Sequence, residues 1–62
     1  MVRSYWVEGD TARGEDFEYR FNSRAEAEAW YDKIVGVPYK VMKAYDDKLG
    51  DIIIKSESSG EV

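Results

Sequence analysis

The sequence predicts an α+β domain with the order hairpin–helix–hairpin (ββαββ), because three kinds of segment follow one another in that order. Segments rich in β-branched and aromatic residues, which are typical of strands, lie toward both ends of the 62-residue chain. A segment rich in Ala and Glu lies between them. Turns rich in Gly and Asp separate the strands of each pair. A chain of this length forms one small domain, which we place at residues 1–55, followed by a flexible acidic tail at residues 56–62.

The first hairpin is predicted at residues 2–8 and 16–21. Residues 2–8 carry large side chains on both faces of the expected strand. In residues 16–21 charged and aromatic side chains alternate strictly, which is typical of a strand with one buried and one solvated face. Gly9 and Gly14 bound the connecting turn.

A helix is predicted at residues 24–35. Ser23 and Glu26 have the spacing of a capping box, in which each side chain hydrogen-bonds to the other residue's backbone N–H. Gly36 and Pro38 follow where a helix ends. The apolar stripe of this helix is formed by Ala27, Trp30, Tyr31 and Ile34.

The second hairpin is predicted at residues 39–45 and 51–55, with Gly50 supplying the positive φ of the turn. The continuous apolar run 52–54 suits a central strand buried on both faces, whereas Lys40 and Lys43 suit an edge strand. We therefore expect a four-stranded mixed sheet in the order 2-1-4-3, with the first and fourth strands adjacent and parallel and the helix packed on one face.

The predicted core combines the helix stripe with one face of the strands. It consists of Phe17, Tyr19, Phe21, Ala27, Trp30, Ile34, Val41, Ile52 and Ile54.

The layout of residues 2–55 resembles that of the immunoglobulin-binding domain of protein G, another short hairpin–helix–hairpin. In size, charge and layout the first half also resembles several small phage proteins that bind and inhibit host enzymes. The likeness is one of layout, so it implies a fold and carries no binding residues over to this chain.

Composition excludes several classes of function. The chain has no Cys and no His, so the usual thiol nucleophile, general base and metal ligands are missing. No apolar run is long enough to span a membrane, and we expect a cytoplasmic protein. Nine Lys and Arg against thirteen Asp and Glu give a net charge of −4, which argues against duplex nucleic acid and favours a basic protein partner.

Carboxylates are the remaining candidates for chemistry. Asp16 and Glu18 share one face of a strand, but acid–base catalysis needs burial that an edge strand of so small a domain does not supply. Acids also gather near the two hairpin turns, where they suit weak Ca²⁺ binding or, as we favour, turn capping. These are Asp10, Glu15 and Asp16 at the first turn and Asp46, Asp47 and Asp51 at the second. We predict no enzyme activity, cofactor or metal.

The nine aromatic residues exceed what one short helix can cover, so some large side chains must lie on the sheet face away from the helix. The predicted partner-binding residues of that face are Tyr5, Val7, Glu18, Arg20, Lys40, Met42 and Ile53. A second predicted surface is the acidic back of the helix, at Glu28 and Asp32.

We therefore expect a non-catalytic protein-binding module that occupies a surface of its partner, as a phage-type inhibitor or adaptor does. One alternative is a structural homodimer that uses the open sheet face or an edge strand. The other is a weak binder of single-stranded nucleic acid, in which sheet aromatics stack on bases.

Overall fold

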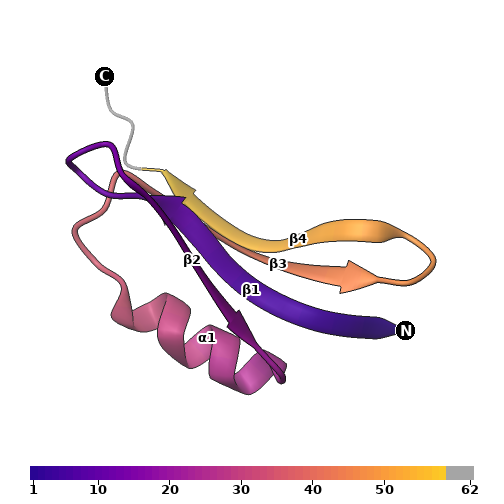
Figure 1. Cartoon of the computed structure of the whole chain (residues 1–62). Coiled ribbons are helices and arrows are strands. Elements are labelled where there is room, and N and C mark those ends of the chain that lie inside the picture. Colours follow the sequence, from indigo (N-terminus) through magenta and orange to yellow (C-terminus); the bar gives the residue numbers. More distant parts are fainter. Residues whose placement is uncertain (59–62) are drawn as a thin grey trace.

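The computed structural model describes residues 1–58, which form a four-stranded antiparallel sheet and one helix (Figure 1). The α+β class is as predicted. In chain order the elements are β1 (Val2–Asp10), β2 (Asp16–Phe21), α1 (Arg24–Lys33), β3 (Tyr39–Asp46) and β4 (Gly50–Ser58). Helix α1 lies on one side of the sheet, across β1, with contacts to β2 and β3 (Figure 1).

The strand order is β2-β1-β3-β4, and every neighbouring pair is antiparallel. The predicted order 2-1-4-3, with a parallel central pair, is therefore wrong. Strand β3 is central because both of its faces are buried, including Val41 and Met42, which are fully buried. Strand β4 is an edge strand, and its Ile53 is 65% exposed. A run of three Ile residues thus marks an edge strand here, against the rule that such runs are central.

Lys40, which predicted an edge, instead anchors the helix to the sheet. Its side chain is buried, and its ammonium donates hydrogen bonds to the carbonyl oxygens of Tyr31 (2.8 Å) and Ile34 (2.6 Å). The same ammonium lies 4.3 Å from the centre of the Tyr31 ring. Carbonyls at a helix C-terminus lack partners within the helix and attract cations. A lysine on the neighbouring strand can therefore be buried when it faces these groups.

The ends of α1 follow the local sequence signals. Ser23 is the N-cap, and its hydroxyl accepts a hydrogen bond from the backbone N–H of Glu26 at 3.2 Å. The helix ends at Lys33, two residues before the predicted end, and the N–H of Ile34 still bonds to carbonyls of the last turn. Gly36 then turns the chain with a φ of 74°.

The core lies between α1 and the sheet. Its centre consists of the buried residues Val7, Ala27, Tyr31 and Met42, and its border of Tyr5, Phe17, Phe21, Ile34 and Ile54. Burial raises the pKa of the Tyr31 hydroxyl, whose oxygen has no hydrogen-bond partner among the described residues.

The predicted core is therefore only partly correct. Tyr19 is 44% exposed, because β2 is an edge strand, and Trp30 and Ile52 are half-buried. Val41 is buried as predicted, but its neighbour Met42 faces the helix, so Val41 lies on the opposite face of the sheet.

Gly9 explains how β1 lies so close to its neighbours. A Cβ atom at this position would collide with the Phe17 ring, the Tyr39 carbonyl oxygen and the Cα of Lys40. Only glycine fits, and the Phe17 ring covers it from the helix side. This contact places Tyr5, Val7 and Gly9, which alternate along β1, on the face that α1 covers.

The second hairpin closes as predicted. Asp46 accepts hydrogen bonds from the backbone N–H groups of Lys48 (2.8 Å) and Leu49 (3.2 Å), which hold the pKa of its carboxyl below the ordinary value. Gly50 has a φ of 81°. Strand β4 then continues to Ser58, three residues past its predicted end, and the rest of the predicted tail, residues 59–62, lies outside the described residues.

Among the described residues, no helix is long and apolar enough to cross a membrane.

Candidate functional site

The sheet face that α1 leaves uncovered, here called the open face, is formed by residues of all four strands. Its members alternate with the helix-facing residues of each strand, and the strand register sets them side by side. They include Trp6, Glu8 and Asp10 on β1, Asp16, Glu18 and Arg20 on β2, Tyr39, Val41, Lys43 and Tyr45 on β3, and Asp51 and Ile53 on β4.

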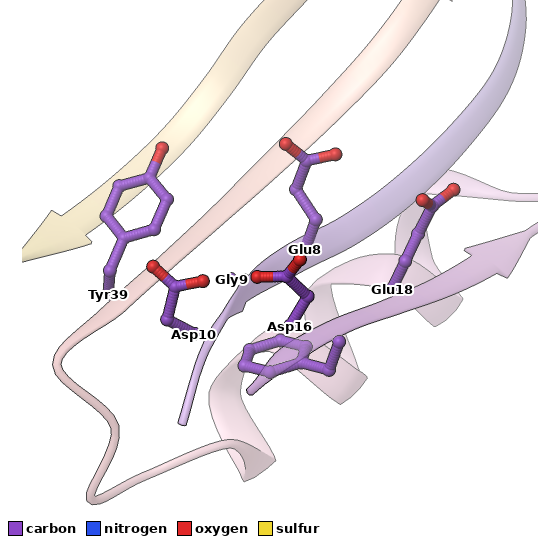
Figure 2. A pocket seen from close by; sticks show the side chains of 7 residues that line it. Glu8, Gly9, Asp10, Asp16, Glu18 and Tyr39 are labelled. Carbon is purple, nitrogen blue, oxygen red and sulfur yellow. The ribbon is translucent and has the colours of Figure 1, made fainter. Parts of the chain in front are cut away.

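One end of the open face carries four carboxylates, here called the acidic corner: Glu8, Asp10, Asp16 and Glu18. The register places Glu8 opposite Glu18 and Asp10 opposite Asp16, so two neighbouring cross-strand pairs have like charges (Figure 2). Like charges directly opposite each other destabilise a sheet. Ion pairs with Arg20 (2.8 Å) and Lys43 (3.2 Å) offset this cost for Glu18 and Glu8, so it falls mainly on the Asp10–Asp16 pair.

The acidic corner borders a shallow hollow of about 390 Å³ that Tyr39 also lines (Figure 2). A hydrogen bond with the Asp16 carboxyl, then burial and charge repulsion, raise the pKa of Asp10 above its ordinary value. Among residues 1–58, no cluster of three or more His, Cys, Asp or Glu is arranged to hold a metal ion. As arranged, the corner is a negatively charged surface that can attract a cationic group.

The centre of the open face is built around Trp6. The indole Nε1 donates a hydrogen bond to Glu8 at 2.9 Å, and the Arg20 guanidinium lies 5.1 Å from the ring centre. Lys43 forms an ion pair of 3.2 Å with the same Glu8 carboxylate. Only 7% of Trp6 is exposed, so charged side chains rather than another element cover this ring.

Apolar groups also remain exposed around the margins of the open face. Ile53 is 65% exposed, and Tyr45 and Tyr39 are 43% and 36% exposed. Since the register pairs Ile53 with Lys43 and Lys43 with Trp6, Ile53 lies two strands from the Trp6 cluster in the same cross-strand row. The open face thus has apolar groups beside a charged cluster, a combination common in protein interfaces.

Four of the residues predicted for this face lie on the other one. Tyr5, Val7 and Met42 pack in the core beneath α1, and Lys40 is buried against the C-terminus of the helix. The physical reason is that Gly9, in phase with Tyr5 and Val7, must lie beneath the Phe17 ring. Their predicted placement on the open face is wrong.

Glu18, Arg20 and Ile53 do lie on the open face, and partner binding by these residues stays a prediction. The predicted acidic back of the helix is on the far side of the molecule from them. There Glu28 forms an ion pair of 3.0 Å with Arg24, and Asp32 is exposed.

Sequence reasoning missed the residues that replace those four. Trp6, Glu8, Lys43 and Tyr45 take the open-face positions because they alternate with the buried ones. A signal was available at Gly9, since a glycine inside a strand often marks the close approach of another group. Applied to β1, that rule puts Trp6 on the face away from the packed side.

No protein-family model matches the chain, and no curated protein or solved structure matches it either.

Proposed function

We propose that this chain is a non-catalytic protein-binding module that docks a partner on its open face. The observation that carries the proposal is the combination of exposed apolar side chains, led by Ile53 and Tyr45, with an acidic corner on the same face. Exposed apolar groups beside charged ones favour association with another protein. Such a module acts by occupying a surface of its partner.

The acidic corner favours a partner with a basic surface. Its carboxylates include Asp10 and Asp16, which have no ion pair with a cation among the described residues, so their charge is available to an incoming group. The same corner disfavours single-stranded nucleic acid, because phosphates would approach carboxylates. Charge complementarity speeds association and selects the partner, while the apolar groups supply affinity.

The experiment compares captured proteins across matched baits. The wild-type chain, an open-face variant Tyr45→Ser/Ile53→Ser and a helix-back variant Glu28→Gln/Asp32→Asn are immobilised, and the proteins retained from a cell lysate are quantified by mass spectrometry. A partner of the open face is retained by the wild type and the helix-back variant and lost by the open-face variant. If every retained protein depends on the helix back, or none depends on the open face, the proposal is wrong.

The acidic corner is tested on the purified partner. We expect Ile53→Ser to weaken binding about tenfold or more, as a central apolar contact does. Asp10→Asn/Asp16→Asn should slow association and reduce its dependence on salt, because surface charges act mainly at that stage. An unchanged salt dependence would show that the corner does not meet the partner.

A further inference from the structure

The two edges of the sheet are protected unequally. An edge strand exposes unpaired backbone N–H and C=O groups, and natural sheets protect such edges with bulges, Lys or Pro. On β4 the register shifts between Met42 and Lys43, so that Ile54 is the extra residue of a bulge, and Lys55 lies on that strand. Strand β2 pairs with β1 without any shift, and it contains neither Lys nor Pro. No other described segment pairs with the outer edge of β2.

The sequence of β2 is symmetric in chemical type about Tyr19. Phe17 and Phe21 lie two residues to either side, and Glu18 and Arg20, of opposite charge, lie one residue to either side. An antiparallel second copy centred on Tyr19 therefore sets Glu18 opposite Arg20 twice, Phe17 opposite Phe21 twice and Tyr19 opposite itself. Opposite charges and aromatic pairs at directly opposed positions both stabilise a sheet.

The charges also select this register over its neighbours. Centring the pair on Glu18 or on Arg20 would set that charge opposite its own copy. Centring it on Phe17 would set Asp16 opposite Glu18 twice. A shift by an odd number of residues would bring the aromatic face of one strand against the charged face of the other. Only the Tyr19-centred pairing brings together opposite charges without also opposing like ones.

The aromatic side of β2 is incompletely covered within one chain. Tyr19 is 44% exposed, although its ring meets the edge of Trp30 at a centroid distance of 5.3 Å. A hollow of about 540 Å³ opens beside Phe21 and Trp30. The buried Nε1 of Trp30 has no hydrogen-bond partner among the described residues. A second copy alongside β2 would cover this aromatic edge.

The helices leave room for such a pair. Both copies of α1 would lie on the same side of the joined sheet, each across its own β1. Three strand spacings of about 4.8 Å put the two β1 strands about 14 Å apart. Packed helices approach to 8–10 Å, so the helices do not collide, and the gap suits the rings of Tyr19 and Trp30.

We propose that two copies of this chain pair through their β2 edges, antiparallel about Tyr19, into one continuous eight-stranded sheet. The dimer leaves both open faces free on the same side of that sheet. Glu18 and Arg20 also lie on the open face, but the tests of the proposed function use Tyr45, Ile53, Asp10 and Asp16, so the two proposals are tested at different residues.

The experiment is a charge-swap cycle read by analytical ultracentrifugation from micromolar to millimolar concentration. The wild type is expected to sediment as a dimer of twice the 7.2 kDa chain mass at the upper concentrations. Glu18→Arg sets two like-charged pairs across the edge, and Arg20→Glu does the same with the opposite sign. Each single variant should be monomeric where the wild type is dimeric.

Mixing the two single variants is the decisive step. In a mixed pair Arg at position 18 of one copy faces Glu at position 20 of the other, and both cross-strand pairs attract again, so dimer should return. Within one chain Glu18 and Arg20 form an ion pair of 2.8 Å, which each single variant loses. That loss cannot explain a dimer that returns on mixing, because neither chain changes when the two are mixed. Asp32→Arg, a similar reversal on the helix back, should leave the dimer intact, and circular dichroism checks that each variant is folded.

Three outcomes would overturn the proposal. The first is a wild-type chain that stays monomeric at millimolar concentration. The second is single variants that dimerise as well as the wild type, and the third is an equimolar mixture that stays monomeric. Should a single variant fail to fold, Glu18→Gln and Arg20→Gln replace the swaps. Each should raise the dissociation constant of the dimer and make that constant less dependent on salt concentration.

Discussion

The two faces of the sheet are made from alternate residues of the same strands, yet they are stabilised in different ways. The helix-covered face is closed by dense packing of Val7 and Met42 against α1. On the open face, charged side chains cover Trp6 and leave Ile53 exposed. Dense packing makes a residue necessary for folding, whereas an exposed position contributes little to stability and is free to serve binding. Matched substitutions on the two faces can test that difference.

The largest difference is expected between Met42→Ala and Ile53→Ala. Met42 is fully buried, so truncation should lower the free energy of unfolding by about 3 kcal/mol through lost burial and a residual cavity. Ile53 is mostly exposed, and its truncation should change the free energy by less than about 0.5 kcal/mol. Urea denaturation of the two variants measures both values. Equal losses would mean that the open face is also part of the folding core.

A smaller difference is expected between two lysines of β3. Lys40→Met leaves the carbonyls of Tyr31 and Ile34 without their buried donor and should cost about 2 kcal/mol. Lys43→Met removes a half-exposed ion pair with Glu8 and should cost less than about 1 kcal/mol. Thermal unfolding at one fixed pH compares them. The assignment of Lys40 as an anchor fails if the two melting temperatures fall equally.

The smallest effect on the free energy of unfolding is expected at the acidic corner. There the test is the direction in which stability changes with pH. The raised pKa of Asp10 means that the folded state holds this proton more tightly than the unfolded chain. Its contribution to stability is therefore fully present below the unfolded pKa and is lost as pH rises through the folded pKa. Asp10→Asn should therefore become more stable relative to the wild type as pH rises through that range. Denaturant midpoints measured at several acidic pH values give the comparison.

The Asp46 carboxyl supplies the internal control, because its pKa is lowered rather than raised. Its contribution is present above the unfolded pKa and is lost as pH falls through the folded pKa. Asp46→Asn should therefore become less stable relative to the wild type as pH rises through that range. NMR titration of the Asp10 carboxyl should also show its pKa falling toward the ordinary value in Asp16→Asn. If it does not move, the two carboxyls do not interact.

Most of the elements were predictable because their signals are local. The cap at Ser23, the turn glycine Gly50 and the alternation in β2 each act within a few residues of the chain, and the structure confirms all three. The strand order was not predictable in this way. The run 52–54 and the position of Lys40 indicated a central fourth strand, but the structure places β3 there.

The candidate site was predictable as a kind of surface but not residue by residue. Too many large side chains for one helix did indicate an exposed sheet face, and Glu18, Arg20 and Ile53 do lie on it. Strand β1 has bulky residues on both faces, so the period of two fits either orientation and does not decide which face packs against α1.

By itself the sequence determined the class, the turns, the helix ends and the lack of Cys and His, since composition and local backbone preferences decide these. Only the tertiary structure decided that β3 rather than β4 lies beside β1, and which side of β1 faces α1. Both depend on groups distant in the chain, namely Phe17 above Gly9 and the helix carbonyls that accept from Lys40. The lysine is buried and the isoleucine run lies at an edge, against the usual preference of each residue type. The free energy of burying a side chain depends on the groups that it contacts as well as on its own polarity.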